Sequence, residues 1–190
     1  MKFKTLYIAA VLIASIAVST AAQVRPATSR PAVSTSDPAR VKTEELNSKL
    51  MGRRMPYRVI LPTDYNKKEE GGRRYPVIYL LHGLTGHFDN WTTKARLAEY
   101  SAGLKVIIVT PEGENGWYTD NLSKENENYD SYIIKELIPE IDRRFRTLSR
   151  RDQRAIGGLS MGGYGAIKFG LKYPDMFVVA GSFSGAPVNT

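Results

Sequence analysis

The stretch 154-RAIGGLSMGGYGA-166 decides the fold of this chain. Residues 154–157 are short and partly apolar, like the end of a buried strand, and the residues after Gly162 are typical of the start of a helix. Ser160 lies between them in a Gly-x-Ser-x-Gly pattern that Gly158 and Gly162 complete. A tight strand-to-helix turn strains the serine backbone, and its glycines avoid clashes between strand and helix. The stretch therefore predicts a sharp corner that presents a serine hydroxyl.

Apolar patterns on both sides of this corner predict alternating strands and helices. Continuous apolar runs at residues 76–81 and 105–109 are typical of strands buried on both faces, and residues 177–183 form a similar run. Three further segments are a hairpin and two helices, the second of which Pro139 should bend or interrupt: residues 41–50 with 55–61, 90–101, and 128–145. This order predicts an α/β domain with a mostly parallel sheet and an N-terminal antiparallel hairpin.

The loops at the carboxyl ends of the parallel strands should carry the chemistry, because ligands gather there. The loop after residue 81 reads His82-Gly83-Leu84-Thr85-Gly86, whose glycines let backbone N–H groups approach a ligand closely. Acyl transfer places negative charge on a carbonyl oxygen, which backbone donors stabilise. We expect these oxyanion-hole donors to be the N–H groups of Leu84 and Met161, and Ser160 to be the nucleophile.

A third loop, residues 110–121, combines turn residues with an aromatic pair. Trp117 and Tyr118 either form a wall of a substrate pocket or pack beneath the loop, and the sequence leaves both interpretations open. Glu112 and Glu114 could suggest the paired carboxylates of a glycosidase, but no second acidic cluster opposes them.

No histidine follows Ser160 in the sequence. Only His82 and His87 are present, and both precede Ser160, whereas the catalytic groups of this kind of elbow follow in the order serine, acid, histidine. We expect His82 to order its loop by hydrogen bonds rather than act as a base, and His87 to lie on the surface. The triad acid and histidine are thus expected to be missing together with a C-terminal part of the domain, and the chain to be weakly active or inactive.

Composition limits cofactors and partners. The chain has no cysteine and two histidines, so we expect no metal and no cofactor. The net charge of +8 is scattered in short clusters without interleaved aromatic residues, which disfavours nucleic-acid binding. The expected partner is a small-molecule or glycan-linked ester, and nothing indicates an oligomeric state.

The N-terminal residues predict export. Lys2 and Lys4 precede an apolar run and then small residues at 19–22, as in a signal peptide, and the run is too short for a membrane anchor. The predicted organisation is a signal peptide at residues 1–22, a disordered tether at 23–39 and an incomplete domain at 40–190. We therefore expect a secreted or periplasmic protein without a stable membrane anchor.

The ordered succession of these motifs resembles the esterase D-like branch of the α/β-hydrolases, which includes secreted tributyrin and feruloyl esterases, S-formylglutathione hydrolases and, more distantly, mycolyltransferases. The segments that carry the resemblance are residues 55–62, 80–86, 115–118, 136–142 and 158–166. The resemblance implies an α/β-hydrolase fold that lacks its last strands and helices, and serine carboxylesterase chemistry through an acyl-enzyme. It also implies that Leu84 and Met161 match the family's oxyanion-hole donors. Two alternatives stay open: a non-catalytic module that binds carbohydrate or acylated sugar, and acyl transfer to a sugar.

Overall fold

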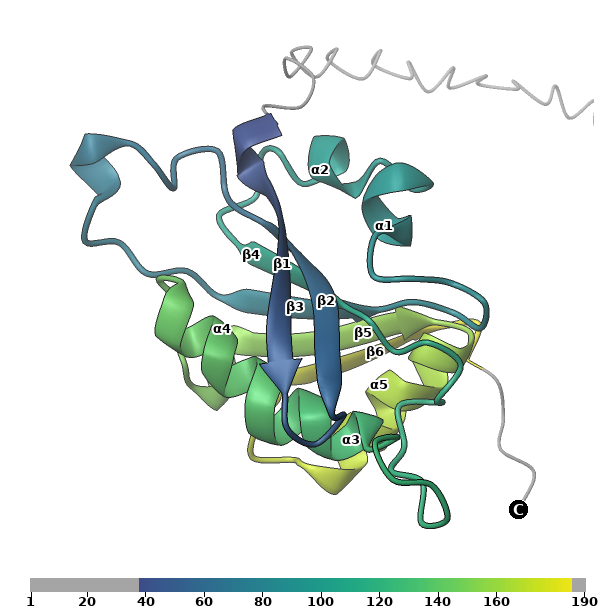
Figure 1. The fold of residues 1–190 in the computed structure, drawn as a ribbon. Coiled ribbons are helices and arrows are strands. Elements are labelled where there is room, and N and C mark those ends of the chain that lie inside the picture. Colours follow the sequence, from purple (N-terminus) through teal and green to yellow (C-terminus); the bar gives the residue numbers. More distant parts are fainter. Residues whose placement is uncertain (1–37, 186–190) are drawn as a thin grey trace, which may run out of the picture. The chain divides into compact units, whose positions relative to one another are not determined.

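A six-stranded sheet forms the centre of the protein in the computed structural model, which describes residues 38–185 (Figure 1). The strands are β1 (Val41–Ser48), β2 (Arg53–Ile60), β3 (Val77–Leu81), β4 (Ile107–Pro111), β5 (Arg154–Leu159) and β6 (Val179–Phe183). The helices are α1 (Asn90–Thr93), α2 (Leu97–Tyr100), α3 (Tyr129–Ser131), α4 (Ile138–Arg144) and α5 (Met161–Lys172), with a π-helical segment (Tyr132–Leu137) between α3 and α4 and short 3-10 turns at Pro38–Arg40, Lys68–Glu70 and Arg151–Gln153. The predicted signal peptide at residues 1–22 and residues 23–37 of the predicted tether lie outside the described residues, whereas Pro38 and Ala39 belong to the first 3-10 turn.

The strand order β1-β2-β4-β3-β5-β6 confirms a mostly parallel sheet with an antiparallel hairpin at one edge. β2 runs antiparallel to both β1 and β4, while β4, β3, β5 and β6 run parallel to one another. The hairpin turns at Gly52, whose φ of 61° suits glycine. Because β3, β4 and β5 are adjacent and parallel, the loops that follow them emerge at one edge of the sheet.

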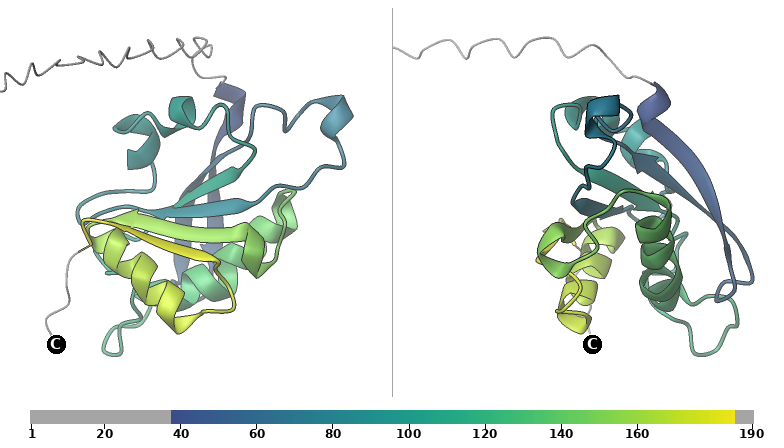
Figure 2. Two further views of the ribbon diagram at one scale, coloured as in Figure 1. Left: turned by 180° about the vertical axis from the view of Figure 1, so that it is seen from behind. Right: turned by 90° about the vertical axis from the view of Figure 1, so that its left-hand side faces the viewer.

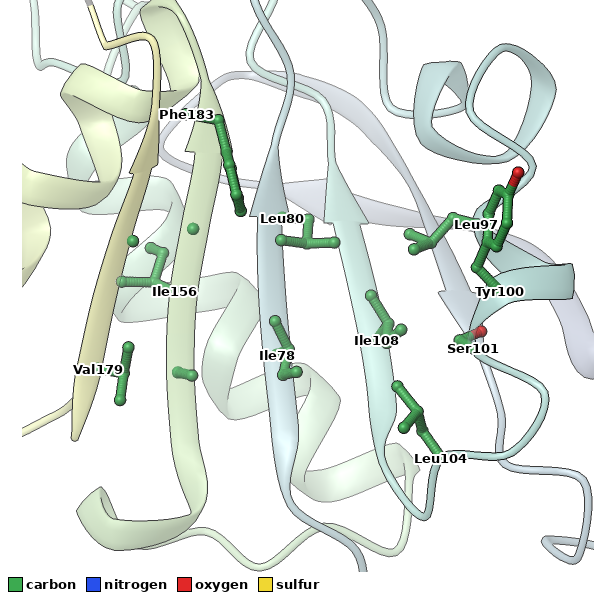
Figure 3. Close-up of a pocket in the computed structure, with 13 residues that line it drawn as sticks. Ile78, Leu80, Leu97, Tyr100, Ser101, Leu104, Ile108, Ile156, Val179 and Phe183 are labelled. Atoms are coloured by element: carbon green, nitrogen blue, oxygen red, sulfur yellow. The ribbon is translucent and has the colours of Figure 1, made fainter. Parts of the chain in front are cut away.

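The two faces of the sheet are covered unequally. On one face, side chains such as Val77, Tyr79 and Ile156 join a large core with the π-helical segment, α4 and α5. α1 and α2 lie over the opposite face (Figures 1 and 2). There a groove of about 350 Å³ runs over Ile78 and Leu80 and reaches β6, as Figure 3 shows.

The predicted helix at 90–101 is wrong as one element, because the structure divides it into α1 and α2. The hydroxyls of Thr92 and Thr93 donate to the carbonyl of Asp89 at 2.7 and 3.1 Å, which closes a local turn. Arg96 then adopts φ of 51° and separates the two short helices. Local side-chain hydrogen bonds thus overrule the helical spacing of apolar residues.

The predicted helix at 128–145 is helical from Tyr129 to Arg144, but it changes its winding. Pro139 falls in the first turn of α4, directly after the π-helical segment. Proline has no N–H to donate to the preceding turn, so the wider winding before it accommodates the missing hydrogen bond without ending the helix. No helix within residues 38–185 has the length and apolar character needed to cross a bilayer.

Candidate functional site

Ser160 occupies the corner between β5 and α5, as the sequence predicts. Its backbone has φ 53° and ψ −115°, a conformation that L-residues rarely adopt. The Ser160 N–H donates to the Phe183 carbonyl at 2.9 Å, which ties the corner to the end of β6. The side chain is neither buried nor fully exposed, and among the described residues its hydroxyl makes no hydrogen bond. The structure therefore presents a serine hydroxyl without an internal partner on a strained turn.

Glycines make this corner sterically feasible. A Cβ on Gly158 would lie 2.3 Å from the Gly162 carbonyl oxygen, and a Cβ on Gly162 would lie 2.4 Å from the Leu81 oxygen. A Cβ on Gly83 would lie 3.6 Å from the Ser160 Cβ, so the loop after β3 passes beside the serine. The glycine pattern thus reflects real contacts between β5, α5 and the loop after β3.

The two amides expected to form an oxyanion hole lie on the two sides of this contact. Leu84 follows Gly83 in the loop, and Met161 is the first residue of α5. Within residues 38–185, neither N–H donates a hydrogen bond to another residue. The N-terminus of a 12-residue helix also carries partial positive charge, which favours an anion beside it. Both N–H groups are therefore without a partner in the described part of the chain, one in the residue after Ser160 and the other in the loop that passes beside the serine.

His82 orders the loop, in agreement with the interpretation from the sequence. Its side chain is 1% exposed, and Nε2 lies 3.1 Å from Glu112 Oε1 and 2.9 Å from the Gly113 nitrogen. Nδ1 lies 2.8 Å from the Gly83 carbonyl oxygen. Both ring nitrogens are therefore engaged away from the Ser160 hydroxyl.

His87 lies on the surface, as expected, with a side chain that is 65% exposed. Its Nδ1 nevertheless contacts Glu112 Oε2 at 3.2 Å, so one carboxylate joins both histidines. Burial alone would raise the pKa of Glu112, but hydrogen bonds from His82 and from the Glu114 and Phe88 amides, together with the charge of His82, lower it to about 2. Glu112 is thus an ionised group beneath the loop after β3.

The two adjacent aromatic residues, Trp117 and Tyr118, differ in burial, so the two interpretations left open by the sequence apply to them differently. Tyr118 is fully buried and donates its hydroxyl to the His82 carbonyl at 3.0 Å, so it packs beneath the loop and has no surface for a substrate. Trp117 is 38% exposed and meets the Tyr164 ring edge-on, with centroids 5.8 Å apart. Only Trp117 therefore remains a candidate for a pocket wall.

The two acidic residues of the same loop do not form a catalytic pair. Glu114 accepts hydrogen bonds from Arg53 at 3.0 Å and from the Tyr129 hydroxyl at 2.6 Å, whereas Glu112 turns inward to the histidines. A further contact, missed by sequence reasoning, comes from Asn115, whose Oδ1 accepts the Thr85 N–H at 2.8 Å. No pattern in the sequence signals this contact, because it joins two loops.

Backbone strain gathers at this edge of the sheet. Non-glycine residues with positive φ occur in the loops after β3, β4, β5 and β6, namely Thr85, Glu114, Trp117, Tyr118, Asn126, Ser160 and Ser184. Such conformations are unfavourable and persist where packing imposes them, often at functional sites. Among residues 38–185, no three histidine or acidic side chains are arranged to hold a metal ion.

Comparison with known proteins identifies a family with the same elements. The family model described as "Putative esterase" matches residues 48–190. The chain is similar to an esterase of Mycobacterium tuberculosis, with 41% identity over 131 residues that cover 67% of this chain and 28% of that protein. It is also similar to an acetyl esterase of Caldicellulosiruptor saccharolyticus, with 36% identity over 135 residues, 69% of this chain and 50% of the relative.

A solved structure gives the same result for the fold. The structure of a ferulic acid esterase matches with a TM-score of 0.66 and 31% identity, and the match covers 73% of this chain and 55% of the other. This chain therefore spans about half, or less, of the length of the relatives that it matches.

Proposed function

Because this chain belongs to the esterase family whose model matches residues 48–190, we propose that it is a serine carboxylic-ester hydrolase with Ser160 as its nucleophile. The observation that carries the proposal is the strained corner itself. Ser160 has φ of 53°, its hydroxyl has no partner among the described residues, and the loop that contains Gly83 passes beside it. A serine hydroxyl without an internal partner on a strained turn is the arrangement that nucleophilic attack needs, and this supports the proposal.

The proposed reaction has two steps. The Ser160 Oγ attacks the ester carbonyl carbon as its proton passes to a base, and the carbonyl oxygen becomes negatively charged. The Leu84 and Met161 N–H groups are the proposed donors to that oxygen, which they would stabilise by several kcal/mol in total. The alcohol then leaves with a proton, and water attacks the acyl-enzyme, releases the carboxylic acid and restores Ser160.

Neither histidine of the described residues is proposed as the base. His82 directs its ring nitrogens to Glu112 and the Gly83 carbonyl, and His87 is bound to the same Glu112.

The names of the relatives suggest which esters to test. One relative is called an acetyl esterase and another a ferulic acid esterase, so acetyl and feruloyl esters are the proposed first substrates. Trp117, which is partly exposed beside Tyr164, is the proposed aromatic contact for the acyl group or for a sugar that carries it. Residues 1–22 resemble a signal peptide, so we propose a substrate outside the cytoplasm, and N-terminal sequencing of the exported protein tests this.

The test combines covalent labelling with turnover. A fluorophosphonate probe should form one adduct on the wild-type protein, found on the peptide that contains Ser160, and none on the Ser160→Ala variant. Hydrolysis of p-nitrophenyl acetate should be lost in the same variant. Labelling that persists in Ser160→Ala would exclude Ser160 as the nucleophile.

Two other results would change the proposal. A rate comparable to that of other esterases, abolished by Ser160→Ala, would reveal a base that the described residues do not show. Saturable glycan binding by both proteins, with no labelling of Ser160, would favour a non-catalytic binding module.

A further inference from the structure

The Glu112 carboxylate lies where the loops after β3 and β4 meet. It follows the last residue of β4, and its side chain is 5% exposed. Oε1 accepts the N–H groups of Gly113 and Glu114 at 3.0 and 2.7 Å. These contacts fold the beginning of its own loop around the carboxylate, so the orientation of this side chain is fixed.

The same carboxylate also holds the neighbouring loop at both of its ends. Oε1 lies 3.1 Å from His82 Nε2, at the point where the chain leaves β3. Oε2 lies 3.2 Å from His87 Nδ1 and accepts the Phe88 N–H at 3.3 Å. Leu84 lies between these two anchored ends, two residues after His82.

Two further contacts fix the first end of the loop. The Gly113 nitrogen lies 2.9 Å from His82 Nε2, and the buried Tyr118 hydroxyl donates to the His82 carbonyl at 3.0 Å. A turn then closes between the Gly86 N–H and the Gly83 carbonyl at 3.0 Å. The loop after β4 therefore contacts both the ring and the backbone carbonyl of His82.

We propose that Glu112 is a positioning residue, which acts through His82 and His87 to hold the Leu84 N–H where the oxyanion of the Ser160 reaction forms. The inference rests on the proposed function, because it assigns Glu112 a role in that same site. Glu112 is not the acid of a catalytic triad, since the second nitrogen of His82 faces the Gly83 carbonyl at 2.8 Å and not the serine hydroxyl.

The chemistry of the site requires a carboxylate at this position. Two oxygens meet donors on both sides, and every contact treats Glu112 as an acceptor. Glutamine has nearly the same shape but turns one oxygen into an NH₂ group, so one set of donors would face another donor. Glu112→Gln therefore removes the hydrogen bonds to one of the two side-chain oxygens without leaving a cavity.

The experiment compares Glu112→Gln with Glu114→Gln in the full-length protein. Glu114 lies two residues away in the same loop, but its carboxylate binds Arg53 and Tyr129 instead of the histidines. With p-nitrophenyl acetate as substrate, Glu112→Gln should lower kcat about 10- to 100-fold, as for a misplaced donor, and leave KM within about twofold. Glu114→Gln should retain the wild-type kcat.

Hydrogen exchange of residues 82–88 supplies a second readout that does not need turnover. The Gly86 amide should exchange faster in Glu112→Gln than in the wild type and in Glu114→Gln, because the turn that it closes is no longer anchored. Unchanged exchange in Glu112→Gln would overturn the inference, as would an unchanged kcat. A fall in kcat that matches the loss of fluorophosphonate-reactive protein would also overturn it, because the variant would then be partly unfolded.

The two proposals fail in different ways. If the wild-type protein neither hydrolyses the ester nor reacts with the probe, the proposed function is wrong. The exchange measurement still decides whether Glu112 orders residues 82–88. If the wild type is active and Glu112→Gln equals it in both readouts, the proposed function stands and the positioning role is wrong.

Discussion

Replacing Gly162 with alanine tests the contact that places the nucleophile beside the loop after β3. The added Cβ would lie 2.4 Å from the Leu81 carbonyl oxygen and 2.6 Å from that of His82. Ordinary contacts between such atoms begin near 3.4 Å, so α5 and the loop must separate by about 1 Å. Both obstructing atoms belong to the backbone, so a side-chain rotation cannot relieve the clash.

Two effects follow from a shift of this size. Overpacking of a close contact costs about 1–3 kcal/mol, which for a domain of this length lowers Tm by roughly 3–10 °C. A misplacement of about 1 Å in the catalytic geometry lowers the rate about 100-fold. Gly162→Ala should therefore label with fluorophosphonate much more slowly than its loss of stability alone explains.

The assay is thermal unfolding together with the labelling rate at a temperature where all variants are folded. Gly181→Ala is the matched control, because Gly181 lies in β6 and a Cβ there meets nothing within 4 Å. If Gly162→Ala keeps both the wild-type Tm and the wild-type labelling rate, the close approach of α5 to the loop after β3 is refuted.

Three further predictions concern buried polar groups. The pKa of Glu112 falls from its ordinary 4.5 to about 2, so the ionised carboxylate stabilises the folded state above about pH 5 by at most about 3 kcal/mol, and this contribution is lost as the pH falls toward 2. In urea unfolding, the difference in stability between the wild type and Glu112→Gln should therefore be smaller at about pH 3 than at about pH 6. An equal difference at both pH values would contradict this. Tyr118→Phe removes the 3.0 Å hydrogen bond to the His82 carbonyl and should cost about 1–2 kcal/mol by calorimetry, whereas an unchanged Tm would show that this hydroxyl does not stabilise the loop. Asp142→Asn weakens the 2.7 Å ion pair with the buried Arg154 and should lower the free energy of unfolding by about 3 kcal/mol in denaturant unfolding. Adding Arg154→Met should restore part of this free energy, and a double variant as unstable as Asp142→Asn alone would contradict the pairing.

The corner at Ser160 could be predicted from the sequence because glycine is needed wherever a Cβ would clash with nearby backbone atoms. Gly158 and Gly162 lie within a few residues of the contacts that exclude a side chain, so the pattern and its cause share one stretch of chain. The parallel strands were predictable for a similar reason, since a strand buried on both faces is apolar throughout.

The local winding of the helices could not be predicted in the same way. The break between α1 and α2 depends on threonine hydroxyls that bind the Asp89 carbonyl, and apolar spacing carries no information about them. The π-helical segment before Pro139 is a backbone adjustment, and the sequence showed only that some adjustment was needed.

The inner side of the site depends on contacts between loops, which no local pattern encodes. Tyr118 and Trp117 are adjacent and similar in character, yet one is buried beneath His82 and the other is partly exposed. Glu112 lies 30 residues from His82 in the chain, and its role emerges only when the neighbouring strands bring both loops together.

The left-handed backbone at the edge of the sheet has a consequence for any selection on heat resistance. Each such non-glycine residue gives up about 1–3 kcal/mol of folding free energy, and glycine would recover part of it. Ser160→Gly should thus melt at a higher temperature than the natural sequence while it loses the proposed nucleophile. Selection for thermal stability alone would therefore favour the loss of this serine, at the expense of the proposed reaction.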